Sequence, residues 1–157
     1  MKIKIVAVGK LKEKFWRDAE NEYAKRLSRF CKFEIIELPD LKNPDLSSEA
    51  LCLEVMKKEG KEILSKIKNE YVIAMCIEGR KVTSERFSEM LSEIPMRNPD
   101  ITFVIGGSLG LSDEVKKRAD MKLSMSDMTF PHALARVMLT EQIYRGFKIL
   151  KGESYHK

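Results

Sequence analysis

The chain lacks any apolar run that approaches the roughly 20 residues of a membrane-spanning helix. It also lacks internal repeats, low-complexity tracts and linker-like segments. The opening MKIKIVAVGK places charges inside a short apolar run, which is typical of a first strand and not of a signal peptide. We therefore expect one cytoplasmic domain over residues 1–157, which is long enough to bury a core.

Cysteine is scarce as well. Cys31, Cys52 and Cys76 are odd in number and lie far apart in the sequence. Their number and spacing match neither a disulfide framework nor a zinc motif. We expect three idle or buried thiols in a reducing compartment, and no metal site.

Charge is present in both signs but is unevenly distributed. The net charge is +5, and residues 2–32 hold ten Lys and Arg against four Asp and Glu. Residues 136–157 hold five against two, so the middle of the chain is acidic. Two basic ends favour a polyanionic partner, with RNA or DNA ahead of a membrane. The alternative is an ordinary solvated surface, since many proteins are this basic without binding nucleic acid.

Apolar periodicity predicts strands that alternate with helices. The expected strands are Lys2–Val8, Phe33–Leu38, Tyr71–Ile77, Asp100–Ile105 and Met121–Met125, with a turn at Glu78–Arg80. The expected helices are Glu13–Phe30, Ser48–Lys68, one from Thr83 to just before Pro95, Ser112–Arg118 and Pro131–Leu150. This alternation predicts an α/β fold with a mostly parallel sheet and helices on both faces.

Ligands of such sheets bind beyond the carboxyl ends of the strands, where three loops are expected to meet. These loops are Met75–Arg80, Gly106–Gly110 and Met125–Phe130. The glycine loop lets a ligand approach the backbone, yet it is neither a Gly-Lys-Ser/Thr phosphate loop nor a dinucleotide fingerprint, and it can equally be a tight turn. Met125–Phe130 offers amides, hydroxyls and apolar groups that suit an adenosine-like ligand. Its Met128 and Phe130 can equally be core residues.

Candidate chemical groups lie on the last helix and the tail. His132 and Arg136 are four residues apart, so they share one helix face. The helix dipole disfavours the charged form of His132, which could then accept a proton, while Arg136 could hold a phosphate. The alternatives are a packing histidine and a surface arginine. Tyr155 and His156 indicate a tail that docks, unless the end of the chain is disordered.

Several motifs of the chain occur together in one known family. They are Ala7–Lys10, Glu22-Tyr23, Gly106–Gly110, Ser126–Arg136, Glu141–Arg145 and Tyr155–Lys157. On these motifs the chain resembles the large-subunit pseudouridine N3-methyltransferases of the SPOUT superfamily of knotted methyltransferases. The resemblance spans essentially the whole chain and is most specific in the last third. One departure is Cys76, where family members often carry a carboxylate.

The resemblance implies a C-terminal trefoil knot, S-adenosyl-L-methionine as methyl donor, and a homodimer in which one subunit's tail completes the other's site. The implied substrate is N3 of a pseudouridine in 23S rRNA of the assembled ribosome. The cofactor-binding residues that it implies are Met75, Gly106, Gly107, Gly110, Met125, Ser126, Asp127, Met128, Thr129 and Phe130. We assign His132 or His156 as the candidate base, Arg136 as the anion or phosphate holder and Tyr155 as the group that positions the base.

Two other functions stay open on the residues alone. One is a non-catalytic basic module that binds RNA or the ribosome. The other is an α/β enzyme that acts on a nucleotide and uses the glycine loop for its phosphate. Binding of S-adenosylmethionine separates the methyltransferase, which the resemblance favours, from both alternatives.

Overall fold

The computed structural model describes residues 1–156, and Lys157 of the tail motif lies outside this range. Five strands form one fully parallel sheet in the order β2-β1-β4-β3-β5. The strands are β1 (Lys2–Val8), β2 (Lys32–Leu38), β3 (Tyr71–Lys81), β4 (Asp100–Ile105) and β5 (Met121–Ser124). The helices are α1 (Lys14–Leu27), α2 (Glu49–Ser65), α3 (Ser84–Glu93), the short 3₁₀ helix η1 (Ile94–Met96), α4 (Asp113–Arg118) and α5 (His132–Leu150). The predicted alternation of strands and helices is confirmed.

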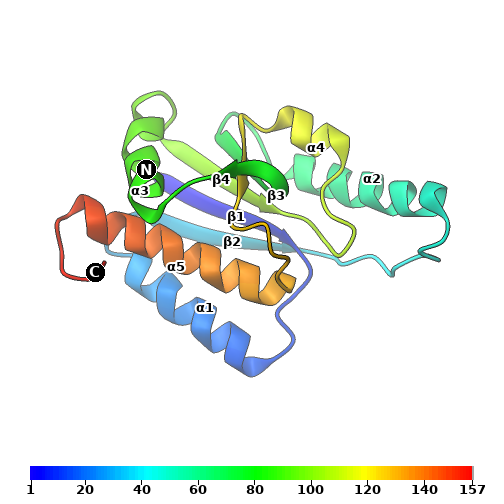
Figure 1. The fold of residues 1–157 in the computed structure, drawn as a ribbon, viewed down its shortest axis with the longest axis horizontal. Helices are drawn as coiled ribbons and strands as arrows, with labels where there is room; N and C mark the ends of the chain where they lie inside the picture. Colours follow the sequence, from blue (N-terminus) through cyan, green and yellow to red (C-terminus); the bar gives the residue numbers. More distant parts are fainter. Residues whose placement is uncertain (157) are drawn as a thin grey trace.

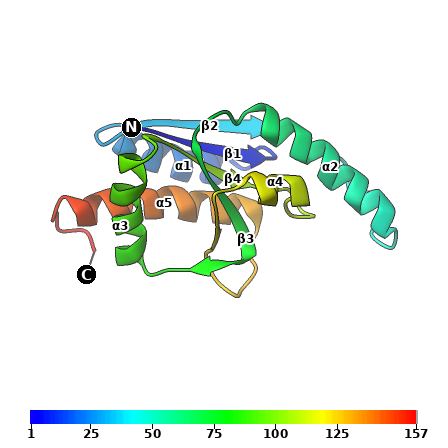
Figure 2. The ribbon, with the colours of Figure 1, turned by 90° about the horizontal axis from the view of Figure 1, so that it is seen from above.

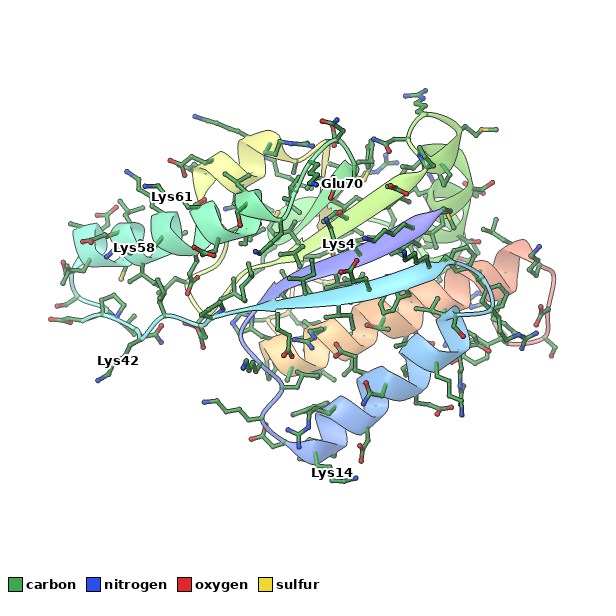
Figure 3. The ribbon with its side chains drawn as sticks, turned by 180° about the vertical axis from the view of Figure 1, so that it is seen from behind. Lys4, Lys14, Lys42, Lys58, Lys61 and Glu70 are labelled. Atoms are coloured by element: carbon green, nitrogen blue, oxygen red, sulfur yellow. The ribbon has the colours of Figure 1, made fainter. Side chains whose placement is uncertain are left out.

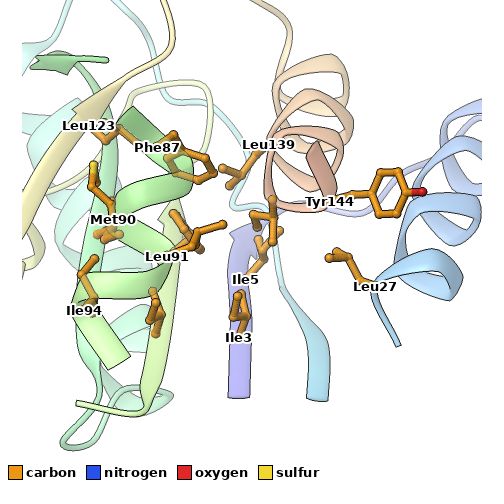
Figure 4. Close-up of a cluster of buried hydrophobic side chains, with 14 of the residues drawn as sticks. Ile3, Ile5, Leu27, Phe87, Met90, Leu91, Ile94, Leu123, Leu139 and Tyr144 are labelled. Atoms are coloured by element: carbon orange, nitrogen blue, oxygen red, sulfur yellow. The ribbon is translucent and has the colours of Figure 1, made fainter. Parts of the chain in front are cut away.

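Helices cover both faces of the sheet, as predicted (Figures 1 and 2). Ile3 and Ile5 of β1 face one way and pack in a buried cluster with side chains of α1, α3 and α5. Val6 and Val8 face the other way and pack with side chains of α2 and α4. Figure 4 shows the larger cluster, in which Leu139 of α5 reaches toward Phe87 of α3. The two-residue period of the strands produces this division.

The predicted turn at residues 78–80 is wrong, because β3 continues to Lys81. Its pairing with β5 shifts register, so that Met75 and Arg80 both lie opposite Leu123. The intervening residues bulge out of the ladder. Gly79 permits this, since a Cβ there would lie 2.5 Å from the backbone carbon of Leu123. The bulge lies at the carboxyl edge of the sheet, where β3 pairs with β5.

Some large apolar side chains of the helices are exposed. Phe15 of α1 is 61% exposed and packs against the neighbouring Trp16 ring, at 4.8 Å between centroids. Leu53 of α2 is 46% exposed. The first half of α2 extends past the edge of the sheet (Figure 2), so only its second half, including the buried Ile63, has a surface to pack on.

The amino edge of the sheet carries a buried ion pair. Lys4 lies on the α2 face of β1, where its Nζ donates to the Lys66 carbonyl at 2.6 Å and to the Glu70 carboxylate (Figure 3). Both side chains of the pair are 10% exposed. This edge is opposite to the one where the three predicted loops lie. No helix within residues 1–156 is long and apolar enough to cross a membrane.

Candidate functional site

A pocket of about 380 Å³ opens at the carboxyl edge of β3, β4 and β5. The three predicted loops form its walls, together with the first turns of α5. Nine of the ten residues that the resemblance implies for the cofactor line this pocket, namely Met75, Gly106, Gly107, Gly110, Met125, Ser126, Met128, Thr129 and Phe130. The tenth, Asp127, does not line it, and its carboxylate is exposed and paired with Lys81 Nζ at 2.5 Å.

The glycine loop is a tight turn that leaves its backbone open to the pocket. The Gly110 amide donates to the Gly107 carbonyl at 3.0 Å, and Gly110 has a φ of +87°. A Cβ on Gly106 would lie 2.7 Å from the carbonyl carbon of Gly110. The turn then leads into α4, whose cap is Ser112, with Oγ accepting from the Val115 amide. Glycine is therefore required at two positions for the loop to close this tightly.

The loop between β5 and α5 is shaped by its serines. Ser124 Oγ donates to the Ser126 carbonyl at 3.0 Å, and Ser126 Oγ accepts from the Met128 amide at 3.0 Å. Pro131 follows as the N-cap of α5, one residue before its predicted place in the first turn. These local bonds explain how a segment without regular structure holds a defined course along the pocket.

A charged pair at the rim was missed by the sequence analysis. Glu78 lies in the bulge of β3, and its carboxylate pairs with Lys116 of α4 at 2.5 Å. The hydrogen bond from Lys116 lowers the pKa of Glu78. Both residues line the pocket, as does Cys76, whose pKa is raised by burial. Glu78 thus brings a carboxylate to the same wall as Cys76. The sequence around Glu78 contains no pattern that predicts the bulge, because the preceding residues form an ordinary apolar strand.

His132 stands at the start of α5 and lines two pockets. One is the pocket described above, and the other is a smaller space of about 210 Å³ that also reaches Lys10, Asp40 and Arg136. The His132 ring is exposed. A titratable ring between two adjoining pockets can exchange a proton with a ligand that occupies either one.

Arg136 does not offer a free cation. Its side chain is 5% exposed, and Nη2 donates to Glu20 and to Glu37, each at 2.7 Å. Nε also donates to Glu20, and Nη1 reaches the Gly9 carbonyl at 3.4 Å. In this arrangement the guanidinium joins α5 to α1 and β2 and has little capacity left for a phosphate. The alternative of an exposed surface arginine is wrong, because Arg136 is buried.

The tail after α5 folds back at the C-terminal end of that helix (Figure 1), where Tyr155 and His156 contact other side chains. The Tyr155 ring packs edge-on against Tyr144, and its hydroxyl donates to Glu141 at 3.1 Å. His156 Nδ1 lies 3.3 Å from Arg145 Nη1, and His156 Nε2 lies 2.7 Å from the Glu85 carboxylate. Because Arg145 can only donate, Nδ1 accepts and Nε2 carries the proton toward Glu85. Neither residue lines the large pocket of its own chain.

Glu141, Gln142 and Arg145 form a hydrogen-bonded network on α5. Arg145 donates to Glu141 at 2.7 Å, and Gln142 donates to the other carboxylate oxygen at 2.8 Å. The network therefore anchors the tail, since Glu141 also receives the Tyr155 hydroxyl. Within residues 1–156 no group of three or more His, Cys, Asp or Glu side chains could hold a metal ion.

The chain is similar to known proteins over its whole length. A family model described as "Predicted SPOUT methyltransferase" matches residues 1–156. A Clostridium perfringens protein (strain SM101) named ribosomal RNA large subunit methyltransferase H 1 is 61% identical over 100% of both chains. An Enterococcus faecalis protein (strain V583) named ribosomal RNA large subunit methyltransferase H is 52% identical over 100% of both chains.

One solved structure gives a likeness of fold alone. It is a probable methylase family protein from Haemophilus influenzae Rd KW20, with a TM-score of 0.54 and 14% sequence identity. The likeness covers 99% of this chain and 70% of that one.

Proposed function

The chain belongs to the SPOUT methyltransferase family, and from this premise we propose that it is a cytoplasmic methyltransferase of large-subunit rRNA. Its α/β sheet is that of the family, and membership implies the trefoil knot of the C-terminal part. We further propose that residues 1–157 act as one domain, that S-adenosyl-L-methionine is the donor, and that N3 of a pseudouridine in 23S rRNA is the acceptor. The identity to methyltransferases across the full chain carries the proposal.

The pocket fits the proposed donor. Its walls are largely apolar, with Ile105, Leu111 and Leu139 available to enclose an adenine ring. The loop backbones bring amides and carbonyls to the same space, and Gly106 keeps them accessible because any Cβ would collide with Gly110. The Glu78–Lys116 pair can meet the amino and carboxylate groups of a methionine moiety at the rim.

For this reaction the protein must align the methyl donor with the acceptor base and provide a group that accepts one proton. When bound, S-adenosylmethionine supplies a methyl carbon on a sulfonium, and rupture of that carbon–sulfur bond leaves a neutral thioether. N3 of the pyrimidine forms the new bond to carbon, so its proton must leave. The exposed His132 ring accepts this proton, and the apolar walls exclude water from the reacting atoms.

Helix length supports a shared site in a homodimer. Tyr155 docks on Tyr144, which is twelve residues after His132 on α5, or about 18 Å along the axis at 1.5 Å per residue. The tail therefore lies away from the pocket of its own chain. If Tyr155 and His156 contribute to catalysis, the partner subunit must supply them.

Mixed dimers test this arrangement. We co-express His132→Ala and His156→Ala subunits with different tags and purify the doubly tagged dimer. A site shared between chains leaves one of the two sites with both histidines, so the mixed dimer should recover about half of wild-type turnover. Without sharing, neither site holds both histidines, and the mixed dimer should be no more active than the mean of the two single-variant homodimers.

The function itself is tested by methyl transfer. Ribosomes from a strain that lacks the enzyme are incubated with the protein and methyl-labelled donor, and label is mapped in 23S rRNA. We expect one labelled pseudouridine, with assembled 70S particles as the better substrate over free rRNA. A non-catalytic binding module would bind the particles without transferring label. An enzyme that acts on nucleotides would show no heat of binding with S-adenosylmethionine in calorimetry.

A further inference from the structure

A second pocket adjoins the proposed donor pocket. It measures about 210 Å³ and shares Ile105, Gly107 and His132 with the larger one. At about 30 Å³ per water, this space equals roughly seven water molecules, which is room enough for one pyrimidine ring. Its other walls come from the β1–α1 loop around Gly9 and from the residues just after β2.

Three polar side chains line this second pocket and are not bonded to other residues of the described chain. Within residues 1–156, Lys10, Asp40 and His132 make no hydrogen bond or ion pair through their side chains, and all three are exposed. Arg136, in contrast, is buried behind the pocket and held by Glu20 and Glu37. A ligand that enters here therefore meets one cation, one carboxylate and one titratable ring.

The position of Asp40 is defined by its neighbours. Its Oδ2 lies 3.9 Å from where a Cβ of Gly9 would be, so the carboxylate rests over the open face of that glycine. The next amide, that of Leu41, donates to Glu59 at 3.4 Å and ties the segment to α2. The carboxylate thus lies at the wall of the pocket and is free to accept a hydrogen bond.

We propose that this second pocket holds the acceptor base, and that Asp40 accepts a hydrogen bond from the N1–H of pseudouridine. The proposal rests on the proposed function. Pseudouridine is joined to ribose through C5, so its N1 carries a hydrogen. With N3 turned toward His132 and the donor, that N1–H occupies the place where uridine presents a C–H. A carboxylate there distinguishes the two bases, because only one of them can donate to it.

The test uses Asp40→Ala and Asp40→Asn in the full chain. Single-turnover methyl transfer is measured, with enzyme in excess, on ribosomes that carry pseudouridine or uridine at the modified position. For Asp40→Ala we expect the rate on pseudouridine to fall about tenfold to a hundredfold, the range for loss of a hydrogen bond to a charged group. The rate on uridine should change by less than about twofold. Asp40→Asn keeps one acceptor oxygen and should fall between Asp40→Ala and wild type.

Calorimetry with S-adenosylmethionine accompanies each variant, and its dissociation constant should stay within about twofold of wild type. The matched control is Asp100→Asn, an exposed aspartate at the opposite edge of the sheet, which should leave both rates unchanged. Equal losses on both bases, or no loss on either, would overturn the role of Asp40 while leaving the methyltransferase proposal standing. A wild-type protein that transfers no methyl to either ribosome would overturn the proposed function itself.

Discussion

The guanidinium of Arg136 on α5 donates to both carboxylate oxygens of Glu20 on α1, across 116 positions of sequence. Both side chains are less than a tenth exposed. Glu37, at the end of β2, accepts from the same guanidinium and also from the Leu11 amide at 3.4 Å. This cluster joins two helices and a strand directly beside the second pocket, so it fixes the wall against which a substrate would rest.

Arg136→Ala should therefore lower the stability of the fold, and any loss of turnover should follow from that. Removal of the cation leaves Glu20 buried without a partner, and we expect the free energy of unfolding to fall by about 3–5 kcal/mol. Urea unfolding followed by circular dichroism measures this. The control is Lys58→Ala, whose pair with Glu54 is exposed on α2 and should contribute at most about 1 kcal/mol. An Arg136→Ala protein with wild-type stability and lost turnover would instead return Arg136 to the site.

Glu59 predicts a pH dependence of stability. Its Oε2 is buried without a hydrogen-bond partner in residues 1–156. Burial raises the pKa of Glu59 above 4.5. The hydrogen bond from the Leu41 amide lowers the pKa by less than burial raises it, and the Asp40 charge raises it further. The folded form thus holds this proton more tightly than the unfolded chain. The resulting stabilisation is complete below about pH 4.5 and is lost as the pH rises through the folded pKa.

Glu59→Gln should remove this dependence. We expect the variant to match or exceed wild-type stability at pH 8 and to lose that advantage at pH 4, as measured by urea unfolding at both values. Glu54→Gln, on the exposed side of the same helix, is the control, because the pKa of Glu54 is lowered by its bond to Lys58. A pH profile of Glu59→Gln that runs parallel to wild type would contradict the assignment.

Two glycines of the loop are needed for different reasons: Gly106 because a side chain would collide with the backbone, and Gly110 because its φ is positive. In Gly106→Ala the new Cβ would meet the Gly110 carbonyl at 2.7–2.8 Å, so the loop must open. We expect S-adenosylmethionine affinity to fall by more than about tenfold. Gly110→Ala meets no atom within 4 Å but has a φ of +87°, so it should cost about 1–2 kcal/mol of stability. Gly152→Ala, with a φ of +63° at the end of α5, should show a similar cost with unchanged donor binding.

The two histidines should differ in their effect on rate. His132 is free at the junction of two pockets, whereas both ring nitrogens of His156 have partners. In single-turnover methyl transfer, His132→Asn should slow the reaction about 10²–10⁴-fold, the range for loss of a general base. His156→Asn should have a smaller effect. The reverse order would assign the base to His156, and wild-type rates for both variants would remove general-base catalysis by histidine.

Much of the architecture can be predicted from local patterns in the sequence. The alternation of apolar runs and helical stripes specifies which segments become strands and which become α-helices along the chain. Parallel strands with two covered faces then require the Gly106–Gly110 and Met125–Phe130 loops to lie at one edge. Both loops do line the same pocket, and their motifs are sufficient to indicate the family.

Tertiary structure alone decided which charged groups are free and which are buried. Arg136 and Glu20 each look like surface residues in sequence, and they become a buried pair only when α5 packs on α1. The bulge that brings Glu78 to the pocket depends on where β5 pairs with β3. Pairing across a sheet and between helices is set by contacts between residues far apart in the chain, and the pattern of one segment holds no information about its partner. The second pocket is formed by four separated segments, so it could be found only once they were folded together.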